Sequence, residues 1–411
     1  MTQLREAERS FTGGGPLVGT VLVAAEIALA VILLAGAVLL IRTFVNLTRV
    51  DPGFDTGRVL TAEVSLTTAR YQEDSDRIEF FRRAVEEIRS VPQVTAAGTV
   101  YPLPLFGRRV TSNLSVEGMP GPGLLPQGTR VELRFVGPGY LEAIGLRQVS
   151  GRFIDESDTA DSPSIVVVNE SFVRQLVPAG DPLGRRLTGD DPSSTDAEWS
   201  TIVGVVEGVR HIDLAQTAGP EAYMPVTQFA FEWATFVVRA RSGAAVELTQ
   251  PVIDAIHRVD PDLPVFNVQT LDSVMKRCLN ATSFVTSLIS LFAATGLALA
   301  GVGVFSVVSF SVGRRLREVA IRMALGGSPA AVLGLLMRQG MVPAAAGVAL
   351  GVIASLAATR LLSSRLYGVA AHDPVTYGAV AGLILAVAAL ATWAPALRAT
   401  RVEPMTLLRT D

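Results

Sequence analysis

The stretch that decides the fold class is Leu17–Ile41, LVGTVLVAAEIALAVILLAGAVLLI, an apolar run of 25 residues with one charge, Glu26. The hydrocarbon core of a bilayer is about 30 Å thick and needs about 20 helical residues, so this run is long enough to cross it. The apolar region of a secretory signal peptide would be only about 7 to 15 residues long. The run therefore predicts a retained membrane anchor rather than a cleaved signal.

Three further apolar runs follow near the other end of the chain, at Phe284–Val312, about Gly340–Leu362 and Val375–Leu397. They are rich in Ala, Gly, Val and Leu, and small residues let membrane helices approach closely. We expect Pro343 and Pro395 to lie near helix ends, where a missing amide is tolerated. Together with the first run, these segments predict a four-helix transmembrane bundle.

The arginines in the short connections predict the orientation of the chain. The segment 313–339 and the tail are rich in arginine, whereas the connection between the third and fourth runs has only Arg360 and Arg365. Positively charged loops stay in the cytoplasm, so we expect both termini and the segment 313–339 to be cytoplasmic. Arg42 and Arg49 point the other way, but a long translocated domain largely escapes the rule.

The residues between the first and second runs predict a large α+β extracytoplasmic domain. Runs of β-branched residues and apolar residues at helical spacing predict six strands, at Val59–Leu66, Thr129–Val136, Ser164–Val168, Thr201–Val209, Thr235–Ala240 and Val265–Val268, and three helices, at Asp76–Ser90, Asn169–Leu176 and Val246–Val259. The predicted division of the chain is residues 1–16, a cytoplasmic N-terminus; 17–43, the first span; 44–283, the extracytoplasmic domain; and 284–411, a membrane domain with the other three spans and the cytoplasmic segment 313–339.

The composition argues against an enzyme. The one lysine, Lys276, follows Met275, so the Gly-Lys pair of a phosphate-binding P-loop is missing. No Gly-x-Ser-x-Gly motif is present, and one cysteine with three scattered histidines gives no zinc-ligand spacing. The net charge of −3 gives no reason to expect nucleic acid as a partner. We therefore predict no catalytic residue, no cofactor and no metal.

Two acidic features need an interpretation. Asp155, Glu156, Asp158 and Asp161 lack the EF-hand spacing, and we interpret them as a solvated loop. Glu26 lies inside a span, where an acidic side chain costs about 2.5 to 3.5 kcal/mol and should face the bundle interior. It marks either a proton or ion path or a static hydrogen bond between helices. We favour the static role, because no second acidic residue lies in any span.

The most informative segment is 314–339, RRLREVAIRMALGGSPAAVLGLLMRQ. Arg314, Glu318 and Arg322 recur at i, i+4 on one side of a helix. Gly326 and Gly327 end that helix, after which Ser328 caps a second helix that begins with Pro329. From the physics alone, the first helix either lies at the lipid interface or docks a cytoplasmic partner.

This segment resembles the cytoplasmic hallmark of MacB/FtsX-type permeases of ABC transporter systems. The carboxy end, TWAPALRATRVEPMTLLR (392–409), resembles the closing pattern of that family, and the domain resembles the MacB-like periplasmic core. The motifs that carry the second resemblance are VDPGFDTGRVL (50–60), FVGPGYLEAIGL (135–146), GRFIDESD (151–158), VVVNESFVRQL (166–176), DPLGRRL (181–187) and IVGVVEGVR (202–210). The opening of the chain resembles the second half of tandem permeases.

The resemblance implies a mechanism and a setting. It implies a multi-pass protein of the bacterial inner membrane that dimerises with a second copy or a paralogue and contacts lipid. A separate cytoplasmic ABC ATPase would dock on Arg314, Glu318, Arg322 and the turn at Gly326 and Gly327, and its motion would pass to the outer domain and any outer protein partner. Three functions stay open: an export or mechanotransmission permease, an FtsX-like regulator of an extracytoplasmic hydrolase, and a membrane scaffold without an ATPase.

Overall fold

The computed structural model describes residues 15–118, 130–178, 180–210, 217–324, 328–362, 367–370 and 372–400. The chain separates into two compact units. One consists of the residues up to Arg49 together with those from Ala281 onward, and the other runs from Val50 to Asn280. The predicted N-terminal segment and the end of the tail lie outside the described residues.

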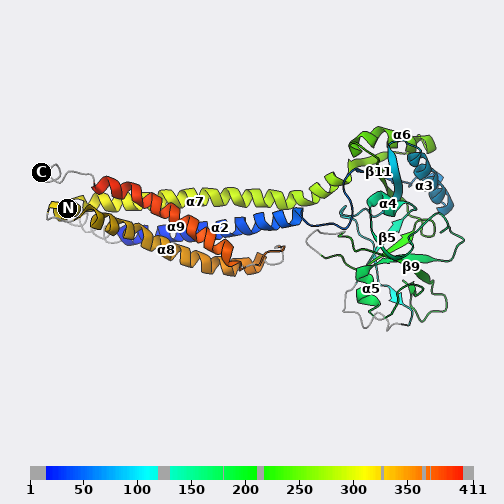
Figure 1. Ribbon diagram of the computed structural model, residues 1–411, viewed down its shortest axis with the longest axis horizontal. Helices are drawn as coiled ribbons and strands as arrows, with labels where there is room; N and C mark the ends of the chain where they lie inside the picture. The colour runs from blue at the N-terminus through cyan, green and yellow to red at the C-terminus, as the bar shows by residue number, and fades with distance from the viewer. Residues whose placement is uncertain are drawn as a thin grey trace, which may run out of the picture. The chain divides into compact units, whose positions relative to one another are not determined.

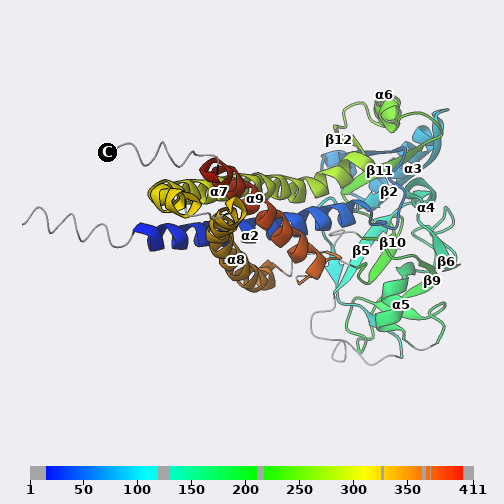
Figure 2. The same ribbon diagram turned by 60° about the vertical axis from the view of Figure 1, so that its left-hand side comes forward.

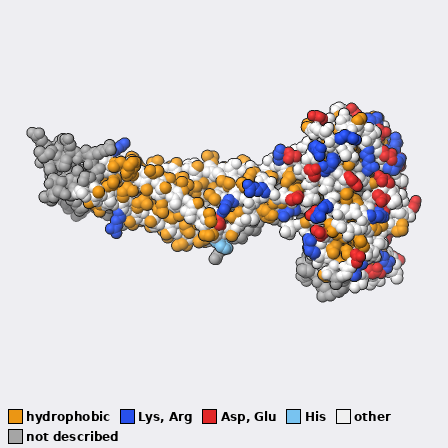
Figure 3. Space-filling model, viewed as in Figure 1, with side chains coloured by type: hydrophobic (Ala, Val, Ile, Leu, Met, Phe, Trp, Pro, Cys, Tyr) orange, Lys and Arg blue, Asp and Glu red, His pale blue; other side chains and the backbone are white. Residues whose placement is uncertain are grey.

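Four long helices form the first unit and confirm the predicted membrane bundle. They are α2 (Gly15–Thr48), α7 (Leu271–Ala324), α8 (Pro329–Leu362) and α9 (Pro374–Thr400). Within the described part of the chain, each contains a stretch long and apolar enough to cross a membrane. Figures 1 and 2 show the helices side by side, and in Figure 3 hydrophobic side chains cover their surface. Such a surface fits a protein surrounded by lipid.

Small residues bring α8 and α2 into close contact. A Cβ atom added to Gly351 would lie 2.6 Å from Cβ of Val31, and one added to Gly347 would lie 2.6 Å from the Ala24 carbonyl oxygen. The two glycines are four residues apart and so share one side of α8. The bundle core is otherwise made of buried Val, Ile, Leu and Ala side chains from all four helices.

The prediction that both prolines lie near helix ends is wrong for Pro343. Helix α8 begins at Pro329, as the cap at Ser328 predicted, but it continues without a break through the third apolar run, so Pro343 falls well inside it. The residues before the apolar run are helical too, and hydropathy alone does not show where a helix continues beyond the bilayer. Pro395 lies in the last two turns of α9. Membrane helices tolerate such prolines because neighbouring groups satisfy the freed carbonyl.

A mixed sheet of twelve strands organises the second unit. Its order is β12-β1-β11-β2-β5-β10-β7-β9-β8-β4, with β3 beside β5 and β6 beside β9. The strands are β1 (Val59–Ser65), β2 (Val94–Tyr101), β3 (Thr111–Ser112), β4 (Ser115–Val116), β5 (Val131–Val136), β6 (Gln148–Gly151), β7 (Ile165–Asn169), β8 (Arg186–Thr188), β9 (Ser200–Val206), β10 (Glu221–Pro225), β11 (Trp233–Ala240) and β12 (Val265–Thr270). Most neighbours are antiparallel, but β5 with β10 and β7 with β9 are parallel.

Short helices cover two separate cores of this sheet. They are α3 (Asp74–Arg89), α4 (Tyr140–Ile144), α5 (Glu170–Leu176) and α6 (Thr249–Val259). Helices α3 and α6 pack together over β1, β11 and β2 (Figure 1), and α5 covers the core around β7 and β10. This arrangement confirms the predicted α+β domain between the first and second membrane helices.

All six predicted strands and three predicted helices of the domain are present, with shifted ends. The predicted helix Val246–Val259 is a 3-10 turn, Ala245–Leu248, followed by α6. Pro251 thereby falls in the first turn of α6, where no intrahelical amide bond is lost. Strand β2 was missed because three of the eight residues in its sequence, VTAAGTVY, are alanine or glycine, which are uncommon in strands.

Candidate functional site

The predicted docking residues lie on the last turns of α7. The helix continues without interruption from Gly313, where its candidate membrane span ends, to Ala324. Arg314, Glu318 and Arg322 are therefore on the same helix as the second span and fall on one side of it by spacing. Gly326 and Gly327 lie outside the described residues.

The start of α8 agrees with the predicted cap. The amide of Ala331 donates both to the carbonyl oxygen of Ser328, at 3.1 Å, and to its Oγ, at 3.3 Å. Pro329 is the first residue of α8. Ser328 therefore satisfies an amide at the helix start that has no intrahelical partner.

Glu26 lies on α2 and faces α7. A Cβ atom on Gly303 of α7 would overlap the Glu26 carboxylate, so the missing side chain at this position makes room for it. No hydrogen-bond partner of Glu26 is found among the described residues, and the predicted interhelical bond is not seen there.

Arg42, which departs from the positive-inside pattern, has an anionic partner within the bundle. It pairs with Asp373, just before α9, and donates to Thr376 Oγ1 at 3.0 Å. Hydrogen bonds from Thr376, together with the charge of Arg42, lower the pKa of Asp373 below its ordinary value. The arginine therefore ties the end of α2 to the start of α9.

The motif VDPGFDTG folds into a compact turn that is joined to β11. Asp55 accepts a hydrogen bond from the Gly57 amide at 2.8 Å and pairs with Arg239 at 2.6 Å. Burial alone would raise the pKa of Asp55, but these hydrogen bonds and the Arg239 charge outweigh it, and the pKa is lowered. Gly53 has a φ of +86°, which favours glycine.

The motif VVVNESF places a buried asparagine between two elements. Asn169 is fully buried and accepts from the amides of Phe172, at 2.8 Å, and Glu221, at 3.1 Å. Its amide group donates to the Gly219 carbonyl at 2.7 Å. One side chain thus caps α5 and fixes the start of β10.

The interpretation of the acidic cluster as a solvated loop is wrong for Asp158. This side chain is 3% exposed and accepts two hydrogen bonds from Arg152, at 2.6 and 2.7 Å. It also accepts from the Asp155 amide at 3.0 Å. The cationic partner precedes it by six residues, within the motif GRFIDESD, and offsets the cost of burying the carboxylate.

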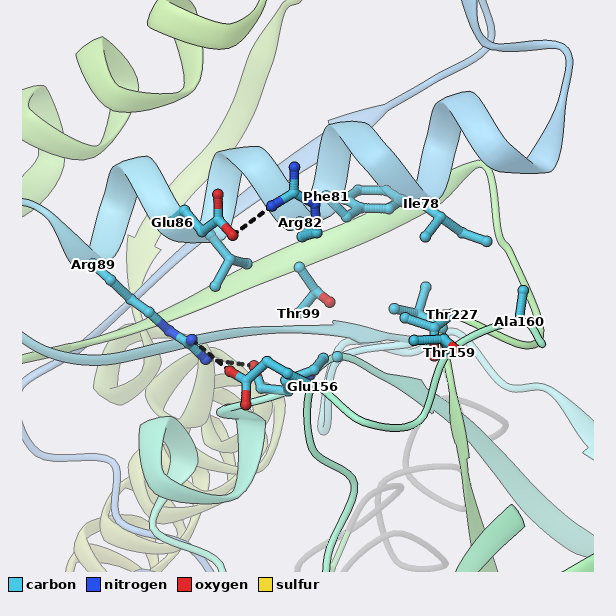
Figure 4. A pocket seen from close by; sticks show the side chains of 14 residues that line it. Ile78, Phe81, Arg82, Glu86, Arg89, Thr99, Glu156, Thr159, Ala160 and Thr227 are labelled. Carbon is cyan, nitrogen blue, oxygen red and sulfur yellow. Dashed lines mark hydrogen bonds and ion pairs between the residues drawn. The ribbon is translucent and has the colours of Figure 1, made fainter. Parts of the chain in front are cut away.

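A cavity of about 190 Å³ lies between α3, β2 and the loop that carries Glu156. Ile78, Phe81 and Val85 line it from α3 (Figure 4). Arg89 and Glu156 lie at its rim and pair at 2.9 Å. Sequence reasoning missed this cavity, because its walls come from segments far apart in the chain and no local motif marks them.

These features define a class: a membrane protein with four spans and a large α+β domain between the first two. Residues 20–256 match the MacB-like periplasmic core domain, and residues 290–404 match the FtsX-like permease C-terminal family. The first match covers more than half of the 411 residues. The chain therefore belongs to the MacB/FtsX-type permease family, as its motifs predicted, and the combination fits an inner-membrane protein.

Several curated relatives are similar over part of their length. The macrolide export ATP-binding/permease protein MacB of Chromobacterium violaceum is 25% identical over 66% of this chain and 42% of that protein. The pyoverdine export ATP-binding/permease protein PvdT of Pseudomonas putida is 24% identical over 64% of this chain and 40% of that protein. This chain thus matches less than half the length of these relatives.

One solved structure with a related fold is the periplasmic region of MacB from Actinobacillus actinomycetemcomitans. It has a TM-score of 0.36 and 13% identity, and it covers 54% of this chain and 92% of that one.

Proposed function

We propose that this chain is the permease subunit of an ABC-type system in which a separate cytoplasmic ATPase drives motion of the extracytoplasmic domain. The proposal includes a dimer with a second copy or a paralogue. It also includes a protein partner of the outer domain, on which the transmitted motion would act in export or another mechanical task.

The observation that carries this proposal is the length and continuity of α7. It has 54 residues and is about 80 Å long at 1.5 Å per residue, whereas the bilayer core is about 30 Å thick. It follows β12 of the domain directly and reaches the segment that holds Glu318. A continuous helix of this length can carry a displacement along its own axis from one of its ends to the other.

The same continuity favours docking over a location at the lipid interface. An interfacial helix lies in the membrane plane, which requires a bend after the span, and α7 has no break before Ala324. Glu318 adds to this argument, because a carboxylate gains nothing from anionic headgroups. The names of the relatives, ATP-binding/permease proteins, support the ATPase as the partner.

The test is a charge reversal, Glu318→Arg, in the chain co-expressed with a candidate ATPase. Exposed helical ion pairs contribute only about 0.3 to 0.5 kcal/mol, so the variant should fold and insert normally. Reversing a charge within an interface costs several kcal/mol, and we expect the ATPase to be lost from a pull-down. The matched control is Glu198→Arg, the same charge change at an exposed residue of the large domain. Equal recovery of the ATPase with both variants would contradict the docking role of Glu318.

The proposed topology has residues 1–16, the segment 313–339 and the tail in the cytoplasm, with residues 44–283 outside. The arginine distribution supports it. In a Cys278→Ser background, single cysteines at Asp191 and at Ser328 can be treated with an impermeant thiol reagent in intact spheroplasts. We expect Asp191→Cys to react and Ser328→Cys to be protected, and the reverse pattern would require the inverted topology.

A further inference from the structure

The hydroxyl group of Thr99 lies inside the cavity beside α3 and has no hydrogen-bond partner among the described residues. Thr99 is 2% exposed and lines the cavity from β2. A Cβ atom on Gly137 would overlap its Oγ1, so the glycine leaves the space that the hydroxyl group occupies. The hydroxyl group therefore opens into the cavity, where it can donate a hydrogen bond to, or accept one from, a ligand that enters.

The wall of the cavity next to α3 is apolar along one strip, beside which the paired side chains of Arg82 and Glu86 also line the cavity. Ile78, Phe81 and Val85 are spaced by three and four residues, which puts them on one side of α3, and Val226 and Ala160 line the cavity from other segments. The volume of about 190 Å³ is somewhat larger than the engineered cavity of about 150 Å³ that holds benzene. The space therefore accommodates one substituted aromatic ring.

The rim of the cavity has a fixed cation and an exchangeable anion. Arg89 is held by two backbone carbonyls, those of Ala97 at 3.1 Å and Pro138 at 2.9 Å. Its partner Glu156 has a side chain that is 74% exposed and makes no other ion pair among the described residues. A ligand carboxylate can therefore replace Glu156 while the guanidinium group stays in place (Figure 4).

The two polar points lie along the same stretch of β2. Arg89 bonds to the carbonyl of Ala97, which is two residues before Thr99 on β2, and two residues of a strand extend about 7 Å. The two para substituents of a benzene ring span a similar distance. A ring with a carboxylate at one end and a hydroxyl group at the other matches both points and the apolar wall between them.

The geometry points to a binding site for a hydroxyaromatic monocarboxylate in the extracytoplasmic domain. The carboxylate pairs with Arg89 in place of Glu156, the ring packs on Phe81 and Val85, and the ligand hydroxyl group bonds to Thr99. This site does not depend on the proposed ATPase, so a binding measurement tests it separately.

The probe is 4-hydroxybenzoate, measured by equilibrium dialysis with the full chain in lipid nanodiscs and with empty nanodiscs as the blank. A ligand of this size should bind with a dissociation constant on the order of 1 mM or tighter. Benzoate, which lacks the hydroxyl group, should bind about fivefold more weakly, the effect of one hydrogen bond. The uncharged 4-hydroxybenzamide should also bind more weakly, because it cannot pair with Arg89.

Two variants separate the contributions. Thr99→Val keeps the shape of the side chain and should reduce the affinity for 4-hydroxybenzoate to that for benzoate. Glu156→Gln removes the competing anion and should strengthen carboxylate binding severalfold, whereas Glu198→Gln, the same change at a remote exposed residue, should not. No saturable binding by the wild-type chain up to about 10 mM, tenfold above the weakest expected constant, would overturn the proposal. So would an unchanged preference for 4-hydroxybenzoate over benzoate in a folded Thr99→Val variant.

Discussion

The contact between α8 and α2 can be tested by one methyl group, in the variant Gly351→Ala. The added Cβ would lie 2.6 Å from Cβ of Val31 and 2.8 Å from the Ala28 carbonyl oxygen. Non-bonded carbon atoms prefer about 3.5 to 4.0 Å, so the helices must separate by about 1 Å or shift along each other. Overpacking of this kind costs about 1 to 3 kcal/mol, and we expect a melting temperature several degrees lower.

The matched control is Gly382→Ala on α9, where no atom lies within 4 Å of the added Cβ. Alanine is the better helix former by up to about 1 kcal/mol, so this variant should be as stable as the wild type or more so. Both are compared by heating in the same detergent, followed by size-exclusion chromatography. If Gly351→Ala melts with or above Gly382→Ala, the close approach of α8 to α2 is incorrect.

Two predictions concern the large domain. Asn169→Ala removes the cap of α5 and the bonds that its side chain makes to two amides and one carbonyl in a buried place. At about 1 to 3 kcal/mol for each lost partner, it should lower the free energy of unfolding by at least about 3 kcal/mol in a denaturant titration. Asn169→Asp should be destabilising as well, because it places a buried carboxylate against the Gly219 carbonyl and the Glu221 carboxylate. Asp55→Asn tests the lowered pKa of Asp55. Because the pKa is lower in the folded state, the ionised carboxylate stabilises the fold at pH values above the unfolded pKa of about 3.9. This stabilisation is lost as the pH falls through the folded pKa. The difference in the free energy of unfolding between wild type and Asp55→Asn should therefore be constant above about pH 5 and become smaller toward pH 3. A difference that does not change with pH would show that the charge of Asp55 does not stabilise the fold.

The membrane part of this fold could be predicted from sequence because a bilayer imposes a length of apolar residues that little else requires. The same reasoning failed at Pro343, because α8 continues as a helix where its sequence is no longer strongly apolar. Helix α7 likewise begins at Leu271, before the apolar run that starts at Phe284. Hydropathy indicates where a helix crosses the membrane, but it does not indicate where the helix ends.

In the domain, residues that decide local structure were easier to predict than residues that act across the sheet. The Asn169–Leu176 segment was predicted as a helix from its own sequence. The hydrogen bond that the Asn169 side chain accepts from the Glu221 amide, at the start of β10, joins residues 52 positions apart, and no local pattern indicates it. Asp158 was misjudged for a related reason: an aspartate within an acidic cluster is expected to be exposed, and the sequence does not show that the Arg152 side chain pairs with it and that it is buried. The cavity beside α3 depends on Thr99, Gly137 and Glu156 meeting in space, and no periodicity indicates that.

The uninterrupted course of α7 also fixes the directions in which its side chains point relative to one another along the helix. Each residue of an α-helix advances the direction of the side chains by about 100°, so one residue inserted in the middle of α7 would turn every face beyond it by that angle, Glu318 included. Seven inserted residues would add nearly two whole turns and restore the facing to within about 20°. Length differences within this helix are therefore not equivalent: insertions close to a whole number of turns, of about 7, 11 or 18 residues, nearly restore the direction of the side chains beyond them, and other lengths do not.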